Sequence, residues 1–240
     1  MEIVLNHLTR MRGERICVAG IDPASNAHIR PTTPPWDLMT RNLLRENGGP
    51  FEIGAVVDLG STTSDGTPPE VEDRRFSTAS ANYVRMLSAE EYLALLDDAS
   101  EPTLEAVFGD QLQRATKWKL GVPVGSGDAS LGVIRGPRWQ RLGVDREYGL
   151  RDGRPTRINA AVHAEDGQAY APVNDLRFFD DRGFVDEDVV AKANARLSTG
   201  VDSFLMVGLT RPHAAGESDG EYHWLQINGL CLVDRPLGLP

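Results

Sequence analysis

Short, β-branched apolar runs closed by clusters of turn-forming residues are the feature that most constrains how this chain can fold. Residues 15–21 and 51–59 are such runs in the first half, and 157–162, 204–209 and 222–233 repeat the pattern in the second. Runs of this length are typical of β-strands, and the Gly, Pro, Asn and Asp residues between them predict turns. No fixed period repeats along the chain, which argues against solenoids and propellers.

Helical patterns interrupt the strands near the middle of the chain. Residues 88–91 read Ser-Ala-Glu-Glu, a capping box in which the serine hydroxyl and the last carboxylate each bond a free backbone amide at a helix start. A second short helix is expected after Ser100, and residues 186–197 form a third helical pattern capped near Asp186. The fold class predicted from the residues is therefore mainly β with helical insertions.

A length of 240 residues allows one or two domains. The change of character along the chain predicts a first β-rich unit over residues 1–78 and a helical connector over 79–116. A second β-rich unit with one inserted helix is expected over 117–240.

Charge restricts the possible partners. The chain has 25 basic and 35 acidic residues, a net charge of −10, which argues against coating nucleic acid or anionic lipid by bulk charge. Residues 110–160 are nevertheless net +5, between acidic segments 46–109 (−10) and 161–240 (−7). Any polyanion site must therefore be local.

The strongest local candidate is residues 135–157, which contain seven arginines interleaved with Trp139 and Tyr148. Cations for phosphates and aromatic faces for bases are what a single-strand-binding groove needs, since stacking contributes about 1–3 kcal/mol per base. The alternative is a solvated arginine-rich loop that pairs with its own acidic neighbours. Trp118, between Lys117 and Lys119, either extends this surface or belongs to the core.

Arg30 and Arg211 each precede a proline, which holds an arginine in extended backbone at a strand or loop edge. They are either phosphate contacts or ordinary salt-bridge partners. The candidate nucleic-acid-binding residues are thus Arg30, Arg135, Arg138, Trp139, Arg141, Tyr148 and Arg211.

Catalytic and metal-binding signatures are not recognisable in the sequence. The glycine-rich stretch 125–132 lacks the Lys-Ser/Thr pair of a phosphate loop, and the five histidines show no metal-ligand spacing. Glu70, Glu72 and Asp73 could form a nuclease-type cluster, with the two glutamates on one strand face, yet no adjacent lysine completes it. We therefore predict a non-enzymatic protein with no catalytic residue, metal or cofactor.

Targeting signals are equally not apparent. The first residues lack the basic and apolar regions of a signal peptide, and no apolar run approaches the length of a membrane span. Cys17 and Cys231 lie in apolar runs, as buried cysteines of a reducing compartment do. We expect a cytoplasmic protein with no membrane partner.

Dispersed strand patterns carry a family resemblance. The stretches are 3–9, 16–22 followed by 28–31, 175–178, and 209–212 followed by 222–229. Together they resemble the dual OB-containing domain (DuOB) proteins of prokaryotic conflict and antiviral systems. The resemblance implies two OB-like β-barrels joined by a short helical segment, and a role in recognising nucleic acid or a nucleotide.

The leading hypothesis is therefore a recognition module for nucleic acid or a nucleotide in a prokaryotic antiviral defence system. One alternative is a protein-interaction subunit whose acidic faces dock a basic effector protein. Another is a hydrolase whose carboxylate or histidine site is assembled only in the folded chain.

Overall fold

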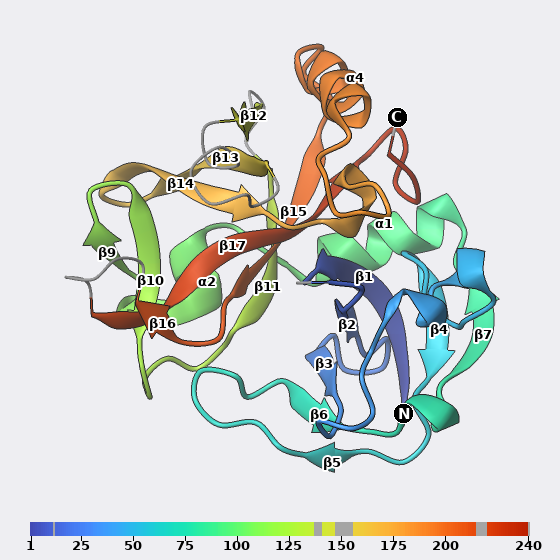
Figure 1. The fold of residues 1–240 in the computed structure, drawn as a ribbon. Coiled ribbons are helices and arrows are strands. Elements are labelled where there is room, and N and C mark those ends of the chain that lie inside the picture. Colours follow the sequence, from blue (N-terminus) through green and yellow to red (C-terminus); the bar gives the residue numbers. More distant parts are fainter. Residues whose placement is uncertain (12, 137–140, 147–155, 215–219, 240) are drawn as a thin grey trace.

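A computed structural model describes residues 1–240 except 12, 137–140, 147–155, 215–219 and 240 (Figure 1). The chain is mainly β: 45% of it is strand and 19% is helix, and the strands form two sheets. The prediction of a mainly β fold with helical insertions is thus confirmed.

The first sheet has seven strands in the order β5-β6-β3-β2-β1-β4-β7. They are β1 (Glu2–Arg10), β2 (Ile16–Ile21), β3 (His28–Thr32), β4 (Ala55–Asp58), β5 (Thr63–Ser64), β6 (Asp73–Arg75) and β7 (Asn82–Met86). β2 and β3 pair antiparallel as the predicted hairpin, and β6 runs parallel to β3. This last pairing places Asp73 beside Arg30 on the neighbouring strand.

The second sheet has ten strands, and its main path is β12-β13-β14-β17-β15-β11-β8. They are β8 (Ser100–Glu101), β9 (Gln113–Thr116), β10 (Lys119–Pro123), β11 (Leu131–Arg135), β12 (Leu142–Asp145), β13 (Arg157–Ala164), β14 (Gly167–Val173), β15 (Ser203–Leu209), β16 (His213–Ala214) and β17 (Glu221–Leu232).

The long strand β17 organises this sheet, because it pairs with β14, β15, β10 and β16. Strand β9 joins through β10. Among the described strands, no pairing closes either sheet into a barrel. Two curved β-rich layers are therefore what the structure establishes.

The helices begin where the sequence predicts. Ser88 and Glu91 form both bonds of the capping box before α1 (Ala89–Asp98), and Asp186 caps α4 (Glu187–Leu197). The short helix α2 (Leu104–Phe108) follows α1. Single 3-10 turns are η1 (Arg41–Leu43), η2 (Arg45–Asn47), η3 (Thr78–Ser80), η4 (Gly109–Gln111) and η5 (Leu176–Phe178).

Two hydrophobic cores accompany the two sheets. Tyr92 and Leu96 of α1 are fully buried in the first core, whereas Leu104 and Phe108 of α2 belong to the second. The segment 79–116 therefore divides between the cores, and its strand β7 pairs with β4 of the first sheet. The domain boundaries predicted at 78 and 116 stay a prediction.

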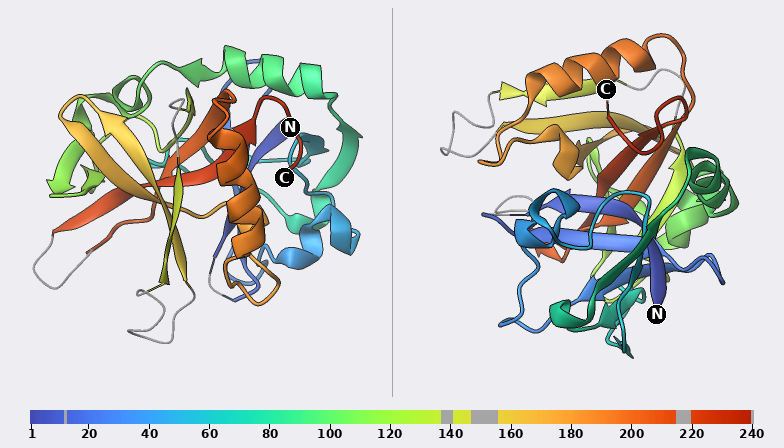
Figure 2. Two further views of the ribbon diagram at one scale, coloured as in Figure 1. Left: turned by 90° about the horizontal axis from the view of Figure 1, so that it is seen from above. Right: turned by 90° about the vertical axis from the view of Figure 1, so that its right-hand side faces the viewer.

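The cores also meet. Met206 of β15 and Cys231 of β17 lie in the second sheet but pack in the first core. In the right-hand view of Figure 2, the blue strands of the first sheet lie below the yellow strands of the second sheet and the orange helix α4. None of the described helices is long and apolar enough to cross a membrane.

Replacing Leu96 by alanine tests the packing of α1 on the first core. Leu96 is fully buried, so we expect Leu96→Ala to lower the free energy of unfolding by about 2–5 kcal/mol, measured by urea denaturation. Glu90→Ala, an exposed position on the same helix, should change it by less than about 0.5 kcal/mol. Equal effects would contradict this packing.

Candidate functional site

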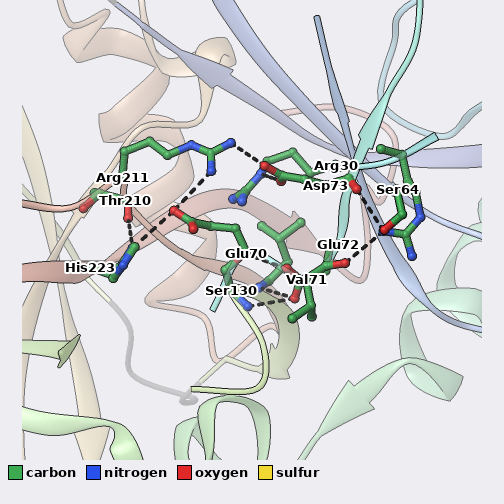
Figure 3. Close-up of polar contacts among 12 residues, drawn as sticks. Arg30, Ser64, Glu70, Val71, Glu72, Asp73, Ser130, Thr210, Arg211 and His223 are labelled. Carbon is green, nitrogen blue, oxygen red and sulfur yellow. Dashed lines mark hydrogen bonds and ion pairs between the residues drawn. The ribbon is translucent and has the colours of Figure 1, made fainter. Parts of the chain in front are cut away.

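An ion-pair cluster of Arg30, Glu70, Asp73, Arg211 and His223 joins the two halves of the chain (Figure 3). The buried Asp73 carboxylate accepts a hydrogen bond from Arg30 Nε at 2.6 Å and another from Arg211 Nη2 at 2.6 Å. Arg30 comes from β3, and Arg211 follows β15 of the second sheet. The Asp73 carboxylate therefore holds one guanidinium group from a strand of the first sheet and one from the loop after β15 of the second sheet.

Glu70 completes the cluster. Its Oε1 lies 3.1 Å from Arg211 Nη1, as an ion pair, and 3.3 Å from His223 Nδ1, as a polar contact. His223 Nδ1 also lies 3.0 Å from the Thr210 carbonyl oxygen. Because a carbonyl oxygen only accepts, Nδ1 carries the proton.

Burial lowers the pKa of the Arg211 guanidinium, but its bond to Asp73 and the charges of Asp73 and Glu70 outweigh that effect. The pKa of Arg211 is therefore raised, which keeps this side chain cationic.

Glu72 faces a different partner from its neighbours. Its carboxylate accepts hydrogen bonds from the Ser130 backbone N–H at 2.7 Å, the Ser130 hydroxyl at 2.7 Å and the Leu131 N–H at 3.2 Å. The expectation that Glu70 and Glu72 share a strand face is wrong, because neither residue lies in a strand: both precede β6 and point to different partners. The carboxylates of Glu70, Glu72 and Asp73 therefore connect the first half of the chain to Arg211 and Ser130 of the second half.

A cavity of about 660 Å³ opens beside the ion-pair cluster, between the two sheets; we call it the arginine cavity. Its walls include Arg10, Arg15, Arg30 and Arg211, and no described lining residue is acidic. The full lining is His7, Thr9, Arg10, Met11, Arg15, Ile16, Cys17, Ala19, Arg30, Pro31, Thr32, Thr33, Leu38, Met39, Leu131, Asn174, Leu209, Thr210, Arg211, His213, Gln226 and Asn228.

Several buried polar atoms on these walls have no hydrogen-bond partner within the described structure. They are both ring nitrogens of His7, Arg30 Nη2, Thr32 Oγ1 and Asn228 Oδ1. An unsatisfied buried polar group costs about 1–3 kcal/mol, so such groups gathered around one cavity favour a binding site.

His7 of the cavity wall and the adjacent His28 are neutral at ordinary pH. Burial lowers the pKa of His7 well below its usual value, and the nearby His28 and Arg30 charges lower it further. Burial lowers the pKa of His28 to about 4. A neutral imidazole has one donor and one acceptor, so His7 can recognise polar edges as well as oxygen atoms.

The structure brings together only some of the predicted site residues. Arg30 and Arg211 share the ion-pair cluster and the arginine cavity. Arg135 lies at the far end of β11 from the cavity-lining Leu131 and pairs with Asp97. Arg141 borders a separate cavity. Arg138, Trp139 and Tyr148 lie outside the described residues, so the predicted 135–157 surface stays a prediction.

Sequence reasoning missed most of the arginine cavity. Arg15 attracted no attention because it stands alone before an apolar run. A signal was present for His7 and Asn228, which interrupt otherwise apolar strands and are almost fully buried. A buried polar residue within a strand is informative, and it could have identified both.

Comparisons with known proteins add little. No protein-family model and no curated protein sequence matches this chain. A solved structure described as a murine DNA-binding protein bound with double-stranded DNA aligns with 95% of this chain and 88% of its own, at 7% identity and a TM-score of 0.32. Similarity at that level does not establish a shared fold. Within the described residues, no group of three His, Cys, Asp or Glu side chains is placed to hold a metal ion.

Replacing Asp73 by asparagine tests the cluster. Since Arg30 is buried and would lose its carboxylate, we expect Asp73→Asn to lower the free energy of unfolding by about 3–5 kcal/mol. The matched control is Asp65→Asn, which breaks the exposed pair with Arg75 and should cost at most about 1 kcal/mol. Urea denaturation measures both, and a similar loss in the two variants would contradict the assigned role.

The buried histidines predict a pH dependence. Below about pH 6.5 the unfolded chain takes up a proton at His28, whereas the folded chain resists it down to about pH 4. The unfolded state therefore binds more protons, and stability falls as the pH decreases through this window. Urea denaturation between pH 7 and 4.5 should show a smaller loss for His28→Gln than for the wild type. If the free energy of unfolding fell equally with pH in the variant and the wild type, that result would argue against a buried neutral His28.

Proposed function

We propose that this protein is a non-enzymatic recognition module that binds nucleic acid or a nucleotide in the arginine cavity. One observation carries the proposal: four arginines line a cavity whose described walls hold no acidic residue. Guanidinium groups present N–H donors in the geometry that phosphate oxygens need, and they stay positively charged at physiological pH.

Phosphate also suits the unsatisfied donors. A phosphate group offers acceptor oxygens, and Arg30 Nη2 is a donor with no partner in the described structure; because this atom is shielded from solvent, the cavity wall must shift for a phosphate oxygen to reach it. Asp73 binds Arg30 only through Nε, so it fixes the guanidinium while the outer nitrogens remain for a ligand. The ion pair thus orients the cation that would contact the phosphate.

The remaining walls suit a base. The accessible apolar residues Leu38 and Met39 provide surface for a ring, and Asn228 offers a buried amide. The Asn174 amide donates to Gln226 Oε1 at 2.8 Å, which fixes the orientation of two further amides. A volume of about 660 Å³ falls within the ~300–1,000 Å³ of small-molecule sites.

The proposal also covers the fold and the biological role. We propose that the two β-rich halves are OB-like β-barrels and that the protein acts in a prokaryotic antiviral defence system. Support for these comes from the strand patterns that resemble DuOB proteins and from two β-rich layers with separate cores. A plaque assay on cells with and without the gene, in its native locus, tests the defence role.

Binding titrations test the cavity directly. We expect Arg15→Gln and Arg211→Gln each to weaken binding of mononucleotides and of a single-stranded oligonucleotide by about tenfold or more, because each removes a charge-assisted contact. Fluorescence anisotropy measures this, and affinity should fall with salt. The matched control is Arg85→Gln, an exposed arginine paired with Glu91 outside the cavity, which should bind as the wild type does.

Two outcomes would contradict the proposal. One is wild-type protein that binds no nucleotide or oligonucleotide and shows an ordinary 260/280 nm absorbance ratio after purification. The other is wild-type affinity in both cavity variants. If the double variant Arg138→Ala/Trp139→Ala alone weakens binding, the predicted 135–157 surface is the site instead.

A further inference from the structure

A second cavity of about 770 Å³ adjoins the arginine cavity; we call it the aromatic cavity. Its walls come from β10, β13, β14 and β17 and from the loop after β1. The residues common to both cavities are Arg10, Met11, Asn174, Thr210, His213 and Gln226. Because they share this wall, one ligand can extend from the first cavity into the second.

Aromatic faces and cations alternate around this second cavity. Tyr170 and Trp224 line it, together with Lys119 and Arg157. The Lys119 ammonium lies 5.5 Å from the centre of the Trp224 ring system. Acidic Glu14 and Asp181 also contribute to the lining, and Asp181 is paired with Arg41. Arg10 and Arg182 line it as well, so four Lys and Arg side chains face two carboxylates, and this excess favours an anionic ligand here too.

Trp118 extends the aromatic surface beyond the cavity. Trp118 is 51% exposed and Tyr170 is 45% exposed. Their rings meet edge to face, with 5.9 Å between the ring centroids. A hydrogen bond from the Tyr170 N–H to the Trp118 carbonyl oxygen, at 2.8 Å, holds the turn between β9 and β10 against β14. The Lys117 ammonium lies 4.8 Å from the Trp118 ring. Single exposed apolar side chains, such as Trp36 at 85%, need no explanation, whereas Trp118 and Tyr170 lie against each other as a continuous aromatic patch.

Lysine placement points the same way. The chain has only three lysines, and Lys117 and Lys119 flank Trp118, while Lys192 lies on α4. Cations beside exposed aromatic faces are the arrangement by which proteins hold unpaired bases and the phosphates between them. In a duplex the base faces are already stacked, so this surface suits a single strand.

We propose that the ligand is a single-stranded nucleic acid of at least two nucleotides, with one in the arginine cavity and the next in the aromatic cavity. One base stacks on the Tyr170 face and a neighbouring base on the Trp118 face, since the two rings are inclined by 63°, and Lys117 and Lys119 contact the connecting phosphates. This inference rests on the proposed function and adds the length and strandedness of the ligand.

Length-resolved binding tests the inference. The probes are a mononucleotide, a dinucleotide, eight-nucleotide single-stranded DNA and RNA, and an eight-base-pair duplex, all measured by calorimetry. We expect either single strand to bind at least tenfold tighter than the mononucleotide and tighter than the duplex. Tyr170→Ala and Trp118→Ala should weaken single-strand binding about 5- to 100-fold and leave mononucleotide affinity within about twofold.

Matched variants separate stacking and charge from damage to the fold. Tyr170→Phe and Trp118→Phe keep an aromatic face and should retain single-strand binding. The double variant Lys117→Gln/Lys119→Gln should lower single-strand affinity and its salt dependence, whereas Lys192→Gln, at the remaining lysine, should not. Thermal unfolding confirms that each variant is folded.

The outcomes distinguish this inference from the proposed function. If mononucleotides bind in the arginine cavity but the oligonucleotide binds no tighter, or Tyr170→Ala and Trp118→Ala change neither affinity, the two-cavity ligand is wrong and the proposed function stands. Tighter binding of the duplex would also overturn it. If no probe binds, the proposed function itself fails.

Discussion

The two hydrogen bonds from Arg30 and Arg211 to the buried Asp73 carboxylate are the interaction on which the candidate site depends. The two arginines are far apart in sequence; Arg30 lies on β3 of the first sheet and Arg211 in the loop that follows β15 of the second, so one carboxylate fixes how the walls of the arginine cavity face each other. A guanidinium has five N–H donors, and Asp73 occupies few of them. The same contact therefore stabilises the junction and fixes the orientation of both guanidinium groups.

The net charge of −10 becomes compatible with an anion site once individual partners are known. Part of the acidic excess lies in residues 46–109, where Glu70 and Asp73 pair with Arg30 and Arg211 behind the cavity wall and Glu72 accepts backbone hydrogen bonds; the two paired arginines therefore contribute less net positive charge to the cavity than Arg15 does. Exposed charges farther away than about 8 Å are largely screened at physiological ionic strength. The groups on the cavity walls, and not the overall charge, therefore decide what enters.

Local signals predicted the elements, and non-local contacts decided the site. Period-two runs located the main strands, and the capping box at Ser88 located α1, because these patterns act over a few residues. The proline after Arg30 and after Arg211 marked two residues that the structure brings together, although no local pattern shows that they share Asp73. Arg135 pairs with Asp97, a partner 38 positions earlier that sequence inspection could not assign.

The unsatisfied atoms around the arginine cavity connect stability with function. His7 and Asn228 sit in strands where an apolar side chain of similar size would avoid the cost of burying a polar group. A fold optimised for stability alone would not gather such groups with arginines at the junction of its two sheets. A bound phosphate and base would give these groups their missing partners, so the positions that weaken the unliganded fold are those that would strengthen binding.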